Sequence, residues 1–212
     1  MRGRDWFYGL MHESHLMLKP GKRRHTTSSN HPYRKYKNMI KGLTVNRINQ
    51  LWVADITYID TDEGVAYLHL LTDAFTHEII GGVLSDSLVA SNTVTALDMG
   101  ISHVSPLGFD GLIHHSDRGV QYCCNQYIDR LQAIKATISM TEDYKPTDNA
   151  IAERVNGIIK QEWLYRMKRP SDVVAARESL AEIIDFYNNR RPHRSNRDML
   201  LPVRLREALT CV

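Results

Sequence analysis

Three carboxylates stand at positions where their surroundings favour other residue types. Asp55 interrupts the apolar and aromatic run "LWVADITYID" at 51–60, and Asp117 ends the run "LIHHSD". An acid on a buried strand is costly unless a charged group compensates for it. The third acid, Glu153, lies in the segment "DNAIAERVNG". For each acid taken alone, the alternative is a satisfied turn, cap or ion-pair residue.

Converging carboxylates predict a site for a hard divalent cation. Mg²⁺ binds through one or two carboxylates together with water and substrate phosphate. A pair of such ions, about 3.5–4 Å apart, holds both the attacking and the leaving oxygens of a phosphodiester. On this interpretation Asp117 ends its strand so that its carboxylate is open to a metal ion and a DNA phosphate.

The expected helix over 149–166 gives Glu153 no structural reason to be there. A capping-box glutamate lies three residues after its cap, and that position here is Ala150, whereas Asn149 or Asp148 is the natural cap. The apolar stripe of the helix is formed by Ile151, Val155, Ile158, Ile159 and Trp163. The opposite face carries Glu153 together with Asn156, Gly157 and Lys160. That face suits phosphate contact, and an ordinary solvated helix face is the alternative.

The spacing of apolar runs and turn residues predicts an α/β fold with one five-stranded sheet. We expect strands at 51–60, 65–75, 77–85, 111–117 and 136–140. We expect helices at 4–17, 90–104, 124–134, 149–166 and 172–188, the second of them capped by Ser91 or Asn92. Short connections make the first three strands an antiparallel meander. The first and fourth strands can then be neighbours, which would bring Asp55 and Asp117 together.

The net charge of +3 hides a strong asymmetry between two parts of the chain. Residues 1–48 hold eleven Lys and Arg against two acids, a balance of +9, so the remainder of the 212 residues carries −6. A basic arm suits a polyanionic partner and favours nucleic acid, with a solvated N-terminus as the alternative. From 19 to 49 the composition is that of an extended linker.

Cysteine usage and hydropathy argue against several classes of protein. Cys123, Cys124 and Cys211 are odd in number and form no CxxC pair, which fits small thiols in a reducing cytoplasm rather than disulfides or a zinc knuckle. No apolar run approaches the ~20 residues of a membrane span, and the N-terminus has no signal-peptide pattern. His114 and His115 have no third ligand at zinc spacing, so we interpret His115 as structural and leave His114 open.

Three blocks of the sequence resemble the catalytic blocks of the retroviral-integrase superfamily. They are "W-x-x-D-I-T-Y" at 52–58, "H-S-D-R-G-x-Q-Y" at 115–122 and "D-N-A-x-x-E" at 148–153. The interval between Asp117 and Glu153 holds 35 residues, the spacing typical of that superfamily. The blocks are most similar to those of the second-frame (OrfB) transposases of the IS-three family of bacterial insertion sequences. In addition, "YNNRRPHRS" at 187–195 resembles their C-terminal signature.

This resemblance implies an RNase H-like (integrase core) fold, with a five-stranded mixed sheet flanked by helices. It implies that Asp55, Asp117 and Glu153 are catalytic and hold Mg²⁺ or Mn²⁺, with two ions expected. Similar enzymes use an activated water to free a 3′-OH at the element end, and that 3′-OH then attacks a phosphodiester. Asp73 resembles a recurrent family acid near the site, but we interpret it as a turn former outside the catalytic set.

The resemblance also suggests which residues contact DNA. Lys160 lies seven residues after the glutamate and matches a family position that is basic and contacts the element end. Further candidate DNA contacts are Asn149, Asn156 and Arg118. The roles of Arg190, Arg191 and His193 in the tail signature do not follow from spacing.

The implied organisation is a basic arm at 1–48, an integrase-like core at 49–190 and a C-terminal tail at 191–212. The implied partners are element-end and target DNA, further copies of the chain on DNA, and the first-frame helix-turn-helix protein, with no membrane. The implied location is the bacterial cytoplasm, at the nucleoid. No complete helix-turn-helix is recognisable, so we expect either a second-frame product or a truncated copy. The tail departs from the family in "MLLP" at 199–202 and in Asn196.

Three functional hypotheses follow. A DNA strand transferase (a transposase) is favoured. A metal-dependent nuclease of the same fold is the second, although the tail signature and the 35-residue interval argue against it. A catalytically silent, DNA-binding truncated regulator is the third, and the presence of all three acids argues against decay of the site.

Overall fold

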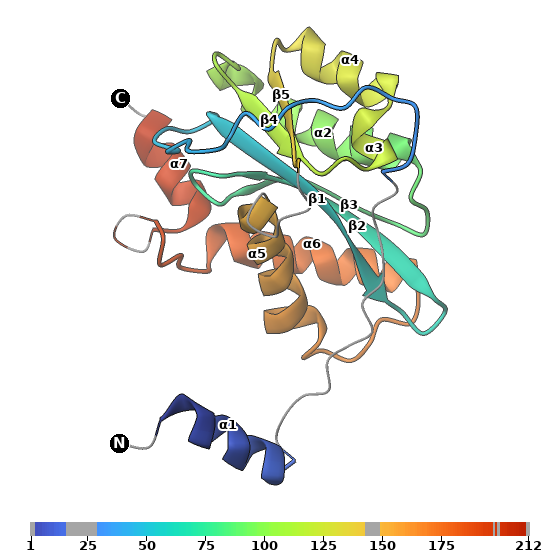
Figure 1. Cartoon of the computed structure of the whole chain (residues 1–212), viewed down its shortest axis with the longest axis vertical. Helices are drawn as coiled ribbons and strands as arrows, with labels where there is room; N and C mark the ends of the chain where they lie inside the picture. Colours follow the sequence, from blue (N-terminus) through green and yellow to red (C-terminus); the bar gives the residue numbers. More distant parts are fainter. Residues whose placement is uncertain (1–2, 16–28, 143–148, 197, 199, 211–212) are drawn as a thin grey trace.

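The central feature of the fold is a five-stranded mixed sheet (Figure 1). The computed structural model describes residues 3–15, 29–142, 149–196, 198 and 200–210. The strands are β1 (Leu51–Asp60), β2 (Val65–Asp73), β3 (Ile79–Ser85), β4 (Ile113–Ser116) and β5 (Thr137–Met140), in the order β3-β2-β1-β4-β5. β1, β2 and β3 pair antiparallel, whereas β4 runs parallel to both β1 and β5. The expected meander and the expected pairing of the first and fourth strands are both confirmed.

Helices cover both faces of this sheet (Figure 1). One face carries α2 (Ala90–Val104), α3 (Val120–Cys123) and α4 (Asn125–Ala133), and the other carries α5 (Ala150–Ile158), the π-helix η3 (Ile159–Leu164) and α6 (Val173–Asn189). The remaining helices are α1 (Arg4–Glu13), a 3₁₀ turn η1 (Ser105–Leu107) and α7 (Pro202–Thr210). Within the described residues, no helix is long and apolar enough to span a membrane.

The alternation of β1 divides the core into two layers. Trp52, Ala54 and Ile56 point into the cluster formed with the α2–α4 side. Ile59 points the other way, into the cluster formed with α5 and α6. This is the two-residue period of a strand that is buried on both faces. It places the side chain of Asp55 on the face that α5 covers.

Close packing of α2 on β3 depends on glycine. A Cβ atom at Gly81 would lie 2.0 Å from the carbonyl oxygen of Ala96, so no larger residue fits there without moving the helix. The start of α2 differs from the expectation: its cap is Val89, with no side-chain hydrogen bond, and Asn92 donates instead to the carbonyl of Ser87. The helix forms because tertiary packing replaces the missing cap.

Several boundaries differ from those expected. The helix expected at 149–166 is divided into α5 and a π-helix, and α3 and α7 were not expected. α6 begins as expected after Asp172, whose carboxylate accepts hydrogen bonds from two backbone N–H groups of the first turn. The expected end of the first helix at 16–17, the cap candidate Asp148 and the thiol of Cys211 lie outside the described residues.

The segment from 29 to 50 contains no helix or strand, as expected for a linker, and it packs against β5. The N–H of Met140 donates to the carbonyl of Lys37 at 3.3 Å, and the N–H of Met39 donates to the hydroxyl of Ser139 at 2.8 Å. Beyond the strand, Glu142 accepts hydrogen bonds from the N–H of Asn38 and from the ammonium of Lys41. The linker therefore covers one edge of the sheet.

Candidate active site

The pairing of β1 with β4 brings two of the candidate acids to the same level of the sheet. Val53 is the register partner of His115 in the parallel β1–β4 pair. Continuing both strands by two residues leads to Asp55 and Asp117, which therefore lie side by side at the carboxyl end of β4. Glu153 lies on the exposed side of the first turn of α5, the helix that crosses over β1.

The pKa of Asp55 responds to both of the other acids. Burial, which is the largest cause, acts together with the negative charges of Asp117 and, to a smaller extent, Glu153 to raise this pKa from 3.8 to about 7. The groups that lower it are the side-chain amide of Asn156 and the backbone N–H of Ile56, rather than a lysine or an arginine. Burial also raises the pKa of Glu153. The site thus concentrates negative charge.

Short hydrogen bonds fix the orientation of two of these acids. Asn156 Nδ2 donates to Asp55 Oδ2 at 2.7 Å. The backbone N–H of Gly119 donates to Asp117 Oδ1 at 2.9 Å, and a Cβ atom at Gly119 would lie 3.0 Å from that same oxygen. The glycine that follows "Asp-Arg" in the sequence is therefore required for the close approach of its backbone to the carboxylate.

The candidate DNA contacts on α5 and η3 all reach β1. Asn149 Nδ2 donates to the carbonyl of Ala54 at 3.1 Å, which anchors the start of α5. Lys160 Nζ donates to Thr57 Oγ1 at 3.1 Å and lies 4.3 Å from the ring centroid of Tyr58. These residues surround the acids on the side of the helix.

The expected division of this helix into a buried apolar stripe and an opposite open face is wrong at Asn156 and Ile151. Asn156 is only 5% exposed, whereas Ile151, expected in the buried stripe, is half-buried. The reason is that α5 lies across β1, so the polar side of the helix covers Asp55 while the apolar side packs on β2 and α6. Helical periodicity predicts one buried face from the apolar residues, and it does not predict that a polar face is covered as well.

Arg118 holds its own loop in place. Its Nη1 donates to the carbonyl of Glu142 at 3.3 Å, and its carbonyl is hydrogen-bonded to His31 Nε2 at 2.9 Å. The loop after β4 is thereby fastened to the basic linker and to the chain after β5.

Tyr122 is a residue near the site that the sequence analysis missed. Its side chain is 2% exposed, its hydroxyl has no hydrogen-bond partner in the described part of the chain, and burial followed by the charges of Asp55 and Asp117 raises its pKa. Its place in the block "HSDRGVQY" is the sequence signal that indicates it.

The neighbouring histidines are structural. His115 Nδ1 is hydrogen-bonded to the Ser139 hydroxyl at 2.8 Å, and His114 Nε2 to the Tyr127 hydroxyl at 2.8 Å. Burial lowers the pKa of His114 to about 3, so its ring is neutral at physiological pH. The thiols of Cys123 and Cys124 are free and buried, as expected.

The tail signature has a structural role that spacing alone did not reveal. The side-chain amide of Asn188 pairs with both the N–H and the carbonyl of Ile79, at the start of β3. Arg191 makes two 2.8 Å hydrogen bonds to the carboxylate of Glu162 in η3. His193 packs edge-on against Tyr187, with 4.7 Å between ring centroids. The signature therefore joins the end of α6 to the sheet and to η3.

The donor set of the site fits a hard cation, although the ligands are not preassembled. Three carboxylates supply only oxygen ligands, as Mg²⁺ prefers, and the raised pKa of Asp55 reflects charge that a cation would offset. Within the described residues, no three Asp, Glu, His or Cys side chains form a ready-made metal cluster.

Comparison with known proteins defines the class first. Integrase core domain families match residues 45–146 and 134–199. The catalytic core domain of HTLV-2 integrase, solved in complex with magnesium in a dimeric form, superimposes with a TM-score of 0.54 over 73% of this chain and 97% of its own, at 17% identity. The fold is thus that of the RNase H-like integrase cores.

Curated relatives narrow the class to a family. The chain is 36% identical over 197 residues to the 31 kDa protein of insertion element IS600 from Shigella sonnei, covering 90% of this chain and 70% of the relative. It is 32% identical over 173 residues to the transposase of IS629 from the same organism, covering 81% of this chain and 56% of the relative. The chain therefore belongs to the insertion-sequence transposases with an integrase core.

Proposed function

We propose that the chain catalyses metal-dependent 3′-end cleavage and strand transfer of the DNA of an insertion sequence. The observation that carries this proposal is the buried position of Asp55 beside Asp117, with the charge of Glu153 close enough to act on it. The carboxyl of Asp55 has a pKa of about 7 because it is buried beside two other acids. Such a cluster is unfavourable for folding by itself, and it suits a site that binds cations and phosphate.

In this proposal Asp55, Asp117 and Glu153 hold two Mg²⁺ or Mn²⁺ ions. When bound, these ions supply Lewis-acid activation of the attacking oxygen and stabilisation of the leaving oxygen. The chain's own groups orient the ligands: Asn156 holds Asp55 and the N–H of Gly119 holds Asp117. In the first step a water cleaves the element end and frees its 3′-OH. In the second step that 3′-OH attacks a target phosphodiester, and the 3′ oxygen of the target strand leaves.

Lys160, Asn149, Asn156 and Arg118 are the proposed DNA contacts. Lys160 is the basic residue that shares a helix face with Glu153. Its ammonium donates to Thr57 and lies over the ring of Tyr58. Asn156 already bonds Asp55, so its contribution is to position the acid as well as the substrate. Arg118 would have to leave its contact with Glu142 to reach a phosphate.

The proposed organisation assigns 1–48 to a basic arm, 49–190 to the catalytic core and 191–212 to a tail. We propose element-end and target DNA, further copies of this chain, and the first-frame helix-turn-helix protein as partners. A dimeric form is described for the HTLV-2 integrase core, which supports self-association here. Action on chromosomal DNA at the nucleoid follows from the same proposal.

A strand-joining assay tests the proposal. Labelled duplexes that carry the terminal sequence of the element are incubated with Mg²⁺ or Mn²⁺ and the chain, and joined products are resolved on a gel. We expect joining by the wild type, and a loss of at least about a thousandfold in Asp117→Asn and in Glu153→Gln, because each removes a ligand that acts together with the others. Glu153→Gln should remain folded, since Glu153 is exposed.

The outcomes separate the functional candidates. Cleavage without joining would support a nuclease instead of a transposase. Joining that persists in both variants would contradict the assignment of the three acids. Activity that appears only when the helix-turn-helix protein is added would mean that this chain performs the chemistry and its partner recognises the element end.

A further inference from the structure

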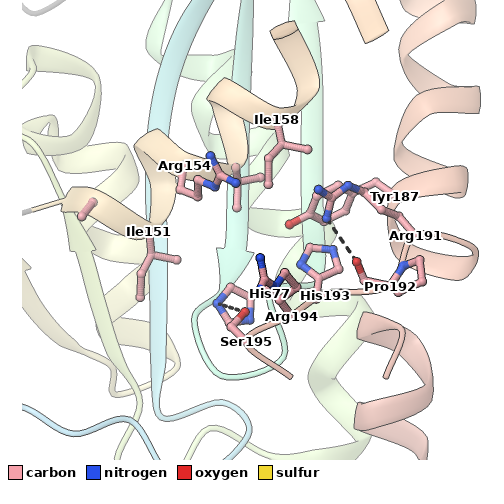
Figure 2. Close-up of a pocket in the computed structure, with 12 residues that line it drawn as sticks. His77, Ile151, Arg154, Ile158, Tyr187, Arg191, Pro192, His193, Arg194 and Ser195 are labelled. Carbon is pink, nitrogen blue, oxygen red and sulfur yellow. Dashed lines mark hydrogen bonds between the residues drawn. The ribbon is translucent and has the colours of Figure 1, made fainter. Parts of the chain in front are cut away.

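A second concave site lies between α5 and the chain that follows α6 (Figure 2). We call it the α5–tail pocket, and its volume is about 440 Å³. Its walls are formed by His77, Ala150, Ile151, Arg154, Val155, Ile158, Tyr187 and residues 191–195. A cavity of this size falls in the range of sites for small organic ligands. None of the residues that orient the three acids lines it.

The mouth of the α5–tail pocket is positively charged. Arg154 comes from α5, and Arg194 comes from the tail (Figure 2). Both side chains belong to exposed residues, and within the described residues neither has a hydrogen-bonding or ion-pair partner. Arg191, the third arginine, is already paired with Glu162. Two exposed arginines that line one pocket favour an anionic ligand, and phosphate above all, although the charge of Arg154 also acts on Glu162.

The inner wall of the α5–tail pocket holds two buried polar groups without partners. Tyr187 is fully buried and His193 is 4% exposed. In the described part of the chain, neither the Tyr187 hydroxyl nor His193 Nε2 has a hydrogen-bond partner. Figure 2 shows both side chains on the wall opposite Arg154 and Ile158. Leaving such groups unsatisfied is costly, so they indicate a ligand that supplies hydrogen-bonding atoms.

The remaining wall of the α5–tail pocket is apolar. Ile151, Val155 and Ile158 form one stripe along α5. An apolar wall, a polar inner wall and a cationic mouth match a nucleotide, which has a flat base with polar edges and an anionic phosphate.

The position of the pocket relative to Glu153 points to DNA as the source of that nucleotide. Arg154 follows Glu153 directly, so the two side chains leave α5 about 100° apart. The diameter of a helix with its side chains is about 10–12 Å, and a DNA strand advances about 3.4 Å per nucleotide. That rise holds along a duplex axis, and an unpaired strand spans more per nucleotide, so a strand whose phosphate reacts at Glu153 can reach the pocket with a nucleotide no more than about three positions away.

We propose that the α5–tail pocket binds one unpaired nucleotide of the DNA substrate, near the reacting phosphodiester. Arg154 and Arg194 hold its phosphate, the isoleucines contact its base, and Tyr187 and His193 bond the edge of the base. This inference rests on the proposed function, because that function supplies the DNA. The base must leave its stack, which costs least at a frayed end.

A binding experiment without catalysis tests this proposal. Two duplexes of the same element-end sequence are compared, one fully paired and one with a single unpaired terminal nucleotide, 2-aminopurine, whose fluorescence reports unstacking. Divalent metal is chelated so that no strand is cut. We expect the wild type to bind the frayed duplex about tenfold more tightly, the size of one charge-assisted contact. We expect Arg154→Ala and Arg194→Ala to lose most of this preference.

Arg190→Ala is the matched control. Arg190 belongs to the same tail signature, but it does not line the pocket, and its side chain is 69% exposed beside Asp185. Arg190→Ala should keep the preference for the frayed duplex. A loss equal to that in Arg194→Ala, or full preference in both pocket variants, would overturn the proposal.

Tyr187→Phe separates ligand binding from folding. Its hydroxyl has no partner in the described residues, so its removal should leave the thermal midpoint unchanged or higher. The preference for the frayed duplex should nevertheless fall by about threefold, the size of one neutral hydrogen bond. A lowered midpoint with unchanged preference would show a purely structural role and would overturn the assignment of this group.

Two further outcomes identify the source of the ligand. Competition by a free deoxynucleoside monophosphate, with equal affinity for both duplexes, would assign the pocket to a free nucleotide and overturn the DNA assignment. Equal binding of both duplexes without such competition would overturn the proposal that the pocket binds a nucleotide, and would leave the proposed function intact. Binding of neither duplex, even with the helix-turn-helix protein added, would contradict the proposed function itself, and with it the inference that depends on it.

Discussion

Two groups of buried acids lie near β1 and β2. One group is paired with an arginine, and the other is not. Asp73 is the register partner of Trp52, only three residues before Asp55 on β1. Asp73 and the nearby Glu78 are both buried, yet the guanidinium of Arg206 on α7 binds both carboxylates. The acids around Asp55 have no comparable arginine among the influences on its pKa.

The two pKa values express this difference. Burial tends to raise the pKa of Glu78, but hydrogen bonds and charge from His103 and Arg206 outweigh it and lower that pKa overall. Burial and neighbouring acids together raise the pKa of Asp55 to about 7. The chain can therefore compensate a buried acid where stability requires it. The absence of such compensation among the influences on Asp55 is the physical basis for the proposed cation site.

The largest effect should come from breaking the compensated group. Arg206→Ala leaves Asp73 and Glu78 buried without their cation, and such losses cost about 3–5 kcal/mol of unfolding free energy. Urea denaturation of the variant and the wild type measures this cost. Arg204→Ala is the matched control on the same helix, because its side chain is 69% exposed beside Glu207 and should cost less than about 1 kcal/mol. Similar losses of unfolding free energy in the two variants would contradict the view that Arg206 compensates buried acids.

The next effect concerns pH and the uncompensated group. Because the folded-state pKa of Asp55 is raised from 3.8 to about 7, its ionisation penalises the folded state increasingly as pH rises from about 4 to about 7, and not below. Without metal, Asp55→Asn should therefore be more stable relative to the wild type at pH 8 than at pH 5, by about 2 kcal/mol. Thermal denaturation at both pH values measures the difference.

Mg²⁺ provides the control for that prediction. Adding the ion at pH 8 should raise the thermal midpoint of the wild type, because it binds the ionised acids, and should raise that of Asp55→Asn much less. Arg204→Ala should respond as the wild type does. If the stability difference between the wild type and Asp55→Asn were the same at pH 5 and pH 8, the carboxyl of Asp55 would not be uncompensated.

The smallest effect should come from Asn156→Ala. This change deletes the 2.7 Å hydrogen bond that Asn156 gives to Asp55 Oδ2, a contact to a charged group worth about 1–2 kcal/mol. The pKa of Asp55 should rise further, and Mg²⁺ affinity should fall by about tenfold. Titration of the ion followed by the thermal midpoint measures this. A variant with unchanged affinity would show that Asp55 is oriented by the strand alone.

Much of the sheet was predictable because its signals are local. The run "LWVADITYID" and the short turns after it define β1 to β3, and the parallel neighbour of β1 follows from the meander. α7 was not predictable, because its place depends on a buried contact between Arg206 and acids 128 and 133 residues away. The prediction of Ser91 or Asn92 as the cap of α2 was wrong, because the position of that helix is set by its packing against Gly81.

The candidate site was predictable in its members but not in its contacts. The three acids stand out as charges on apolar elements, and strand order brings two of them together. The position of Asn156 against Asp55 required the crossing direction of α5, which helical periodicity does not contain. The role of Asn188 and His193 likewise depends on tertiary neighbours, Ile79 and Tyr187, rather than on spacing within "YNNRRPHRS".

The covered edges of the sheet carry a practical consequence. The backbone of β5 is shielded by Lys37 and Met39 of the linker, and the start of β3 is bonded by Asn188. A recombinant fragment that began at Asn49 would expose the β5 edge and would invite strand-to-strand aggregation. Crystallographers and enzymologists who shorten this chain should therefore retain residues 36–48, because these residues cover the β5 edge.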